Sequence, residues 1–433
     1  MTTHHTIGDV QTLLKAGRHA QAEAVCREML GNEPGNIAVL NILSSIIAMD
    51  ERYEESASYL EPVLQNDPEN PDLLLGYGRL LRLAKRAGDA LPYLRKANTL
   101  RKSHPACLEL GYALANQELF DEACTVFNKA LELDPACIIS IKQLGHIAMI
   151  EGDPDKANQY YEKVVRLAPG DINSYPELIE NRLMAGEPQS ALDLCEKCLQ
   201  IEPASTGTFG FKYIALSELE DTRGVNYMLD PERHIRTMAA SCPPSFDSIQ
   251  DFNSYLAYHV LNNTEKCSRQ ENYTTKGGWQ TKGMNLFDKN KQLGDIVENM
   301  LSKVLEEYIS HLPDDPEHPI IKGRPSAQHT ISWAVVLDRQ GHQDPHIHPG
   351  SWLSCVYYIQ LPEDFDSQPE PDAGHIVFGQ GKRQLHPLHK PATKVIKPVE
   401  GNFIMFPSYA WHCTIPLLSE GQRISMAFDV VEK

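Results

Sequence analysis

The stretch "LGYALANQELFDEACTVFNKALELDPAC", residues 110–137, carries the pattern that decides the fold of the first half of the chain. Its apolar residues recur at the three- and four-residue spacing of amphipathic helices. Gly111 and Ala123 are twelve positions apart, and Pro135 follows twelve positions later. Small residues let two helices approach closely, and proline ends a helix because it lacks the backbone N–H group. The stretch therefore predicts a pair of short antiparallel helices.

The same pattern recurs along the first half of the chain. The small residue returns every 33 or 34 positions, at Ala22, Ser56, Ala90, Ala123, Ala157 and Ala191. Proline follows five of these positions after twelve residues, at Pro34, Pro68, Pro135, Pro169 and Pro203. The period and these positions resemble tetratricopeptide repeats. The resemblance implies an all-α solenoid of about six repeats over 5–206, whose groove binds a protein or peptide. A structural spacer or a dimerisation surface is the alternative role.

The repeat period is lost after residue 206. We expect a helical linker over 207–245 and a second domain over 246–433. Amphipathic patterns predict helices over 248–263 and 292–312. Short apolar runs between prolines and glycines predict strands near 328–338, 352–361, 374–378, 393–397, 402–407, 411–416 and 423–431. Many short strands at close spacing favour a β-sandwich or barrel, with the two helices outside one sheet.

Histidines gather just before one of these strands, in "HQDPHIHPGS", residues 342–351. Side chains alternate faces along an extended chain, so His346 and His348 share one face and can converge on one metal ion. His412, at the start of a later strand, is the candidate third ligand, and borderline metals such as Fe(II) accept imidazole. The competing interpretations are a solvated loop for the pair and a core histidine for His412.

Arg423 begins the last predicted strand, and Ser425 lies on the same face. An arginine that faces the interior of a barrel needs a partner, because an unpaired buried charge is costly. A carboxylate suits the planar guanidinium, which can donate two parallel hydrogen bonds. A bound dicarboxylate can therefore bridge metal and arginine, and a salt bridge to Asp429 or another acid is the alternative.

The segments with this chemistry resemble the 2-oxoglutarate/Fe(II)-dependent oxygenases, in particular those whose oxygenase domain follows tetratricopeptide repeats. The resemblance covers about residues 225–431 and rests on "HIHPGSWLSCVYYIQLP", "GHIVFG", "GNFIMFPSYAWHCTIP" and "RISMAFDVV". It implies an α+β domain with a double-stranded β-helix core of the jelly-roll or cupin type. It also implies Fe(II), O2 and 2-oxoglutarate as cosubstrate. Arg423 and Ser425 would hold the distal carboxylate of 2-oxoglutarate, and Tyr358 would add a hydroxyl group.

The ligand set departs from the family habit. These oxygenases usually show His-x-Asp or His-x-Glu, whereas this segment reads His346-x-His348. Three ligand sets therefore stay open. The first is His346, His348 and His412, the second is Asp344, His346 and His412, and the third is His342, Asp344 and His412. Local strand geometry favours the first set, and the family habit favours the other two.

These patterns together predict a hydroxylase-type dioxygenase to which the repeats deliver a protein or peptide. The alternatives are a three-histidine iron dioxygenase that needs no 2-oxoglutarate and a non-enzymatic repeat scaffold with a metal-free barrel.

A net charge of −18 argues against a nucleic-acid-binding surface. The N-terminus "MTTHHTIGDV" lacks the features of a signal peptide, and no apolar run is long enough to span a bilayer. We therefore expect a cytoplasmic protein, without nucleic-acid or membrane partners, whose ten cysteines are mainly buried thiols.

Overall fold

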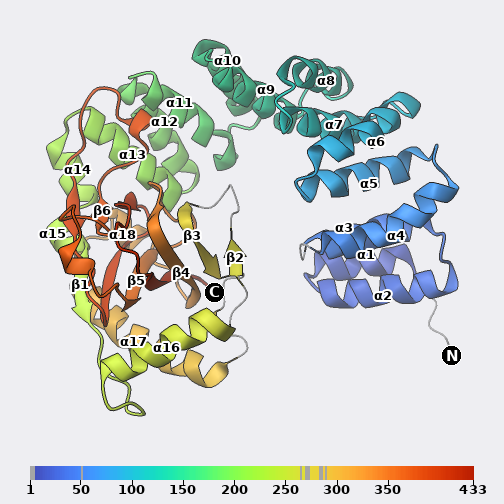
Figure 1. The fold of residues 1–433 in the computed structure, drawn as a ribbon. Coiled ribbons are helices and arrows are strands. Elements are labelled where there is room, and N and C mark those ends of the chain that lie inside the picture. The colour runs from blue at the N-terminus through green and yellow to red at the C-terminus, as the bar shows by residue number, and fades with distance from the viewer. Residues whose placement is uncertain (1–4, 50–51, 264–265, 269–273, 282–285, 288–289) are drawn as a thin grey trace. The chain divides into compact units, whose positions relative to one another are not determined.

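The computed structural model describes the chain except for residues 1–4, 50–51, 264–265, 269–273, 282–285 and 288–289 (Figure 1). The chain divides into two compact units, Met1–Pro169 and Gly170–Lys433. The domain limits expected from the repeat period, 5–206, 207–245 and 246–433, stay a prediction. In the described ranges, no helix combines the length and the apolar character needed to cross a membrane.

The first unit consists of helices that follow one another as antiparallel pairs (Figure 1). They are α1 (Ile7–Lys15), α2 (His19–Asn32), α3 (Ile37–Met49), α4 (Tyr53–Asn66), α5 (Pro71–Leu83), α6 (Ala87–Leu100), α7 (His104–Ala115), α8 (Phe120–Leu133), α9 (Ile138–Ile150) and α10 (Pro154–Leu167). The quoted stretch forms α7 and α8, and Pro135 comes just after the end of α8. The expected all-α solenoid of helix pairs is confirmed.

The small residues of the repeat lie where two helices touch. All of them are completely buried, namely Ala22, Ser56, Ala90, Ala123, Ala157 and Ala191. The only polar member, Ser56, donates a hydrogen bond to the carbonyl oxygen of Ser44 across 2.9 Å. Gly111 of α7 lies against the ring of Phe127 on α8, so closely that a Cβ atom there would come within 2.6 Å of the ring. Close helix contact is therefore the physical reason for the repeated small residues.

The second unit opens with further helices and continues with strands. The helices are α11 (Pro176–Met184), α12 (Pro188–Ile201), α13 (Thr206–Glu218), α14 (Thr222–Met228), α15 (Pro231–His234), α16 (Ile249–Asn263), α17 (Lys291–Ile309) and α18 (Pro319–Lys322). Short 3-10 turns lie at Ile172–Ser174, Phe365–Ser367 and Arg383–Leu385. The indole N–H group of Trp411 donates to the carbonyl oxygen of Gly210, across 2.9 Å. Helix α13 thus contacts the connection between β8 and β9.

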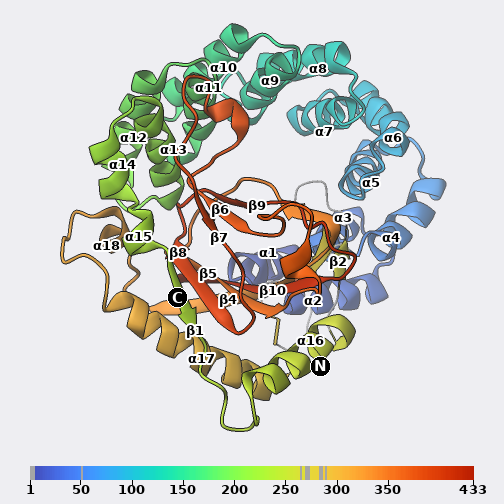
Figure 2. The same ribbon diagram turned by 60° about the vertical axis from the view of Figure 1, so that its left-hand side comes forward.

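Two antiparallel sheets form the core of this unit (Figure 2). The larger sheet has the strand order β1-β8-β5-β10-β4-β3-β2, and the smaller sheet has the order β7-β6-β9. The strands are β1 (Arg236–Ala239), β2 (Lys266–Ser268), β3 (Thr275–Thr281), β4 (Gln328–Gln343), β5 (Leu353–Gln360), β6 (Ile376–Phe378), β7 (Lys394–Ile396), β8 (Asn402–Pro407), β9 (His412–Thr414) and β10 (Arg423–Glu432). The rings of Phe378 on β6 and Phe406 on β8 lie 4.8 Å apart and join the two sheets. The expected double-stranded β-helix core is confirmed.

The two long helices of the second unit lie outside the larger sheet, as expected. Tyr357 on β5 donates its hydroxyl hydrogen to Oδ1 of Asn253 on α16, across 2.6 Å. A shallow cavity of about 320 Å³ is lined by α17 together with Ser332 of β4 and Phe428 of β10. These contacts leave the opposite face of the larger sheet for the smaller sheet and for the candidate site.

Three strands differ from the sequence expectations. Arg236–Ala239 forms β1, although the whole of 207–245 was expected to be a helical linker. Strands β2 and β3 form between the two predicted helices, where no strand was predicted, and residues 264–265, 269–273, 282–285 and 288–289 of this connection lie outside the described residues. All three lie toward the edges of the larger sheet, where long-range pairing fixes the backbone. Such pairing leaves little local pattern in the sequence.

Candidate metal and carboxylate site

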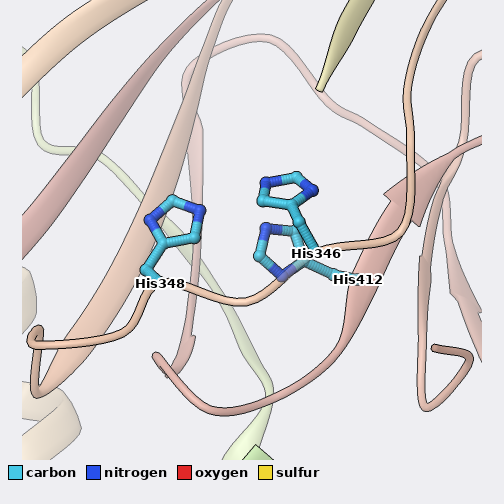
Figure 3. Close-up of side chains that lie close together, drawn as sticks. All are labelled: His346, His348 and His412. Atoms are coloured by element: carbon cyan, nitrogen blue, oxygen red, sulfur yellow. The ribbon is translucent and has the colours of Figure 1, made fainter. Parts of the chain in front are cut away.

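Three histidine side chains meet between the two sheets (Figure 3). His346 and His348 lie in the connection from β4 to β5, and His412 is the first residue of β9. The backbones of His346 and His412 exchange two hydrogen bonds of 3.0 Å, which bring these residues side by side. One ring nitrogen of each histidine lies within 4.8 Å of the others. The sequence-predicted trio is therefore brought together.

The hydrogen bonds of the three rings identify which nitrogen atoms are free. Nδ1 of His346 lies 2.7 Å from the carbonyl oxygen of Asp344, and Nδ1 of His412 lies 2.9 Å from that of Ala410. A carbonyl oxygen can only accept, so both Nδ1 atoms carry the hydrogen. Nδ1 of His348 faces the carboxylate of Asp429. This tautomer leaves the lone pair on each Nε2 atom, which is the form that binds a metal.

Burial keeps two of the rings neutral. Loss of contact with water, and then the neighbouring His348, lowers the pKa of His346 to about 3. Burial and the two neighbouring histidines likewise hold the pKa of His412 well below its ordinary value. At neutral pH these imidazoles need not lose a proton before they bind a cation. Neutral imidazoles suit a borderline divalent metal such as Fe(II).

The two alternative ligands lie outside this group. The carboxylate of Asp344 is about half exposed, 3.5 Å from Nε2 of His342 and 3.9 Å from Nζ of Lys276. Nδ1 of His342 lies 3.1 Å from the carbonyl oxygen of Gln340. In the part of the chain that the structure describes, neither residue joins the group formed by His346, His348 and His412.

Arg423 is buried without an acidic partner among the described residues. Its side chain is 1% exposed, and its guanidinium donates to the carbonyl oxygen of Gly374 across 2.7 Å. Its buried Nε atom has no hydrogen-bond partner among those residues. The guanidinium lies 5.8 Å from the ring centre of Tyr358, and Tyr358 pairs with Ser425 across β5 and β10. A buried guanidinium without an acidic partner is a suitable receptor for a carboxylate.

Burial also shifts the pKa values of Arg423 and Tyr358. It lowers the pKa of Arg423, which the nearby Tyr358 partly offsets. It raises the pKa of Tyr358 to about 12, so that the phenol keeps its hydrogen and can donate it at neutral pH.

Asp429 is the functional candidate that sequence reasoning missed. It appeared there only as an alternative partner for Arg423, whereas its carboxylate contacts His348 and accepts from the hydroxyl group of Ser354. The alternation of β10 contained the available signal, because Arg423, Ser425 and Asp429 lie on one face of that strand. The sequence could not show that His348 is the partner of Asp429, because the two residues are far apart in the chain.

Comparisons with known proteins agree with both halves of this description. Residues 331–429 match the family described as "Putative 2OG-Fe(II) oxygenase". Residues 50–105, 104–137 and 143–171 match tetratricopeptide-repeat families. No curated protein matches the chain significantly. Fold and site thus define a repeat solenoid joined to a double-stranded β-helix domain. The chain combines tetratricopeptide repeats with a domain that matches that oxygenase family.

Solved structures similar to the chain include several repeat proteins. PilW, a widely conserved type IV pilus biogenesis factor, is 20% identical with a TM-score of 0.41, over 45% of this chain and 90% of that chain. A tetratricopeptide repeat protein from Parabacteroides merdae is 16% identical with a TM-score of 0.41, over 51% and 87%. YrrB, a repeat protein with an unusual peptide-binding site, is 17% identical with a TM-score of 0.33, over 41% and 92%.

Proposed function

We propose that the second unit is an Fe(II)- and 2-oxoglutarate-dependent dioxygenase of the hydroxylase type. The strongest support for this proposal is that two features occur together within the same pair of sheets. Three histidines offer converging ring nitrogens, and a buried guanidinium has an Nε atom without a partner among the described residues. The family match of residues 331–429 supports the same function.

Each side chain has a distinct role in this proposal. His346, His348 and His412 hold Fe(II) through their Nε2 atoms, and Arg423 holds the distal carboxylate of 2-oxoglutarate with help from Tyr358. When bound, the metal, O2 and 2-oxoglutarate would supply the oxidation, in which 2-oxoglutarate becomes succinate and CO2, one oxygen atom of O2 enters succinate and the other enters a substrate C–H bond. The protein orients and shields these groups.

Strand β6 relates the two halves of the proposed site. The ring of Phe378, at the end of β6, lies 6.0 Å from that of His412. Gly374, four residues earlier, accepts the hydrogen bond from Arg423. This short segment therefore contacts both the histidine group and Arg423.

The test is turnover of 2-oxoglutarate by the full chain. The protein is purified without oxygen, loaded with Fe(II) and supplied with O2 and 2-oxoglutarate, and succinate is measured. We expect succinate from the unaltered chain and none above background from His412→Ala. The matched control is His389→Ala, because the His389 side chain is 40% exposed. Normal succinate formation by a folded His412→Ala variant would contradict the proposal.

A parallel series assigns the ligand set. His348→Ala tests the three-histidine set, while Asp344→Asn and His342→Asn test the two alternatives. We expect Fe(II) binding to be lost in the first variant and kept in the other two, because Asp344 lies away from the histidine group. Lost binding in Asp344→Asn with retained binding in His348→Ala would instead select the second set if His342→Asn keeps Fe(II), and the third set if His342→Asn loses it.

A cosubstrate-independent three-histidine dioxygenase is the second candidate. It is favoured by the described ligand group, which contains three histidines and no carboxylate. Arg423 would then hold a carboxylate of the substrate itself. Oxygen uptake with and without 2-oxoglutarate separates the two enzymes, because only the first requires the diacid. A chain that binds no iron at all after reconstitution would indicate the metal-free scaffold.

We propose that the repeats of the first unit recruit a protein or peptide substrate. A cavity of about 430 Å³ lies among α3, α5 and α7, and its lining includes Met49, Leu83 and the charged residues Arg79 and Glu109. Met49 is 68% exposed in this mixed apolar and charged groove. A photo-crosslinking residue at position 49 should capture the substrate protein, while one at Leu133, an exposed residue of α8, should not.

A further inference from the structure

One carboxylate lies directly behind His348. Both carboxylate oxygens of Asp429 are 2.8 Å from Nδ1 of His348. The hydroxyl group of Ser354 donates to Oδ1 of Asp429 across 2.6 Å. Asp429 is only 4% exposed, so its carboxylate has exchanged water for these partners. A buried carboxylate is costly without such partners, and the imidazole and the hydroxyl group therefore hold it in place.

The three histidines consequently differ in the groups that accept a hydrogen bond from their Nδ1 atoms. His346 and His412 donate to backbone carbonyl oxygens, which carry no net charge. Only His348 donates to a carboxylate. A carboxylate that accepts from a ligating histidine fixes the tautomer and the ring orientation and makes the other nitrogen more basic. The Nε2 atom of His348 is thus the most basic of the three histidine nitrogens that face the metal position.

The same contact supplies charge to the site. Three neutral imidazoles bring no negative charge to a divalent cation, whereas a site of two histidines and one carboxylate brings one. Asp429 provides a negative charge that is separated from the metal position by one imidazole ring. We infer that Asp429 is a positioning residue, which orients His348 and supplies through it the charge that a directly bound carboxylate would provide. This inference rests on the proposed function for the identity of the metal.

The first test is metal affinity, measured by titrating Mn(II) into the full-length chain without 2-oxoglutarate. Asp429→Asn keeps the shape of the side chain and removes its charge. We expect about 10- to 100-fold weaker Mn(II) binding. We also expect a changed absorption spectrum of the Co(II)-loaded chain, because the donor strength of His348 changes. Ser354→Ala removes a hydrogen bond that holds the same carboxylate, and we expect a smaller loss of Mn(II) affinity. This second variant tests the inference even if Asp429→Asn does not fold well.

Glu218 and His386 provide a matched control. Their side chains form a buried carboxylate–imidazole pair, 3.2 Å apart, on α13 and on the connection from β6 to β7. We expect Glu218→Gln to lower the melting temperature and leave Mn(II) affinity unchanged. Asp429→Asn with unchanged Mn(II) affinity, and only a lower melting temperature, would show that Asp429 is purely structural and would overturn the inference.

An exchange of residues gives the second test. His348→Asp would place two carboxylates beside each other, and their repulsion should weaken Mn(II) binding strongly. Adding Asp429→Asn removes the repulsion and creates a site of two histidines and one carboxylate. We expect the double variant to bind Mn(II) at least about tenfold more tightly than His348→Asp alone. Equal affinities of the single and double variants would contradict the coupling between positions 348 and 429.

The failure of this inference can be told apart from failure of the proposed function. If the unaltered chain binds no Mn(II), or binds it equally after His412→Ala, the proposed metal site itself is wrong. If His412→Ala abolishes binding and Asp429→Asn does not weaken it, only the role of Asp429 is wrong.

A Cys137→Ser variant removes any contribution from the other described group of potential ligands, His104, Asp134 and Cys137 in the first unit.

Discussion

The guanidinium of Arg423 donates to the carbonyl oxygen of Gly374 across 2.7 Å, while its Nε atom has no partner among the described residues. Gly374 precedes β6, the strand whose other end carries Phe378 beside His412. One hydrogen bond therefore holds the cation beside the residues that lead into β6, whose other end lies next to His412. The N–H group of Nε stays available for a carboxylate.

Substitution of Arg423 should weaken 2-oxoglutarate binding. Arg423→Lys keeps the positive charge and loses the planar fork, and Arg423→Met loses both. We expect the Kd for 2-oxoglutarate to rise roughly 30-fold or more in Arg423→Met, equivalent to about 2 kcal/mol, and less in Arg423→Lys. The measurement is calorimetric titration of the Mn(II)-loaded variants. An unchanged Kd in both would remove Arg423 from the proposed site.

Two neighbouring hydroxyl groups should contribute less than the charge. Tyr358→Phe and Ser425→Ala each remove one neutral hydrogen-bonding group. The Tyr358 ring centre lies 5.8 Å from the guanidinium, and Ser425 pairs with Tyr358 across the two strands. A neutral hydrogen bond contributes about 1 kcal/mol, so we expect each variant to raise the KM for 2-oxoglutarate by roughly fivefold. Succinate formation at saturating 2-oxoglutarate should stay close to that of the unaltered chain. A loss of kcat with an unchanged KM would point to a different role.

The sequence predicted the central strands well because burial leaves a strong pattern. β5, β8 and β10 occupy the middle of the larger sheet and have long apolar runs. Strand β1 at one edge and β3, next to the other edge strand, lacked such runs. In β3, Gly277 has a positive φ beside an irregular pairing with β4, and this breaks the alternation that marks a strand.

The same reasoning explains what could be read of the site. His346 and His348 are two residues apart, so strand alternation alone places them together, and His412 begins a recognisable strand. Their proximity could be expected, but the hydrogen of each Nδ1 atom depends on carbonyl groups that only the folded chain brings into place. Asp429 required knowledge of the pairing between β10 and β5, which sets Asp429 opposite Ser354.

The glycines of the repeats should be sensitive to the smallest substitution. A Cβ atom at Gly111 would lie 2.6 Å from the ring of Phe127, which is fully buried, so that any shift of the ring disturbs its neighbours. Overpacking of this kind costs about 1–3 kcal/mol, which exceeds the gain of roughly 1 kcal/mol from replacing glycine by alanine in a helix. We therefore expect Gly111→Ala to lower the melting temperature, as followed by circular dichroism.

Gly31 provides the matched control for this prediction. It also lies in a helix, α2, but a Cβ atom there would meet nothing within 4 Å. Gly31→Ala should leave stability unchanged or raise it by up to about 1 kcal/mol. Combining Gly111→Ala with Phe127→Leu should recover part of the lost stability. If Gly111→Ala proved as stable as Gly31→Ala, close helix contact could not be the reason for the glycine.

Acid should destabilise the second unit through His234. Burial, followed by the neighbouring His318, lowers the pKa of His234 to about 4 from an ordinary value of 6.5. Between these two pH values the unfolded chain binds a proton that the folded chain does not, so the free energy of unfolding falls as the pH is lowered from about 6.5 to about 4. The full effect below that range is roughly 3 kcal/mol.

His234→Asn isolates this contribution. Nδ1 of His234 accepts a hydrogen bond from the backbone N–H group of Asp230 across 3.0 Å, and the amide oxygen of asparagine can accept the same bond without titrating. We expect the variant to lose less stability than the unaltered chain between pH 7 and pH 5. The measurement is chemical denaturation of the full chain at both pH values, monitored by fluorescence. Equal losses in both proteins would show that His234 does not control the acid sensitivity.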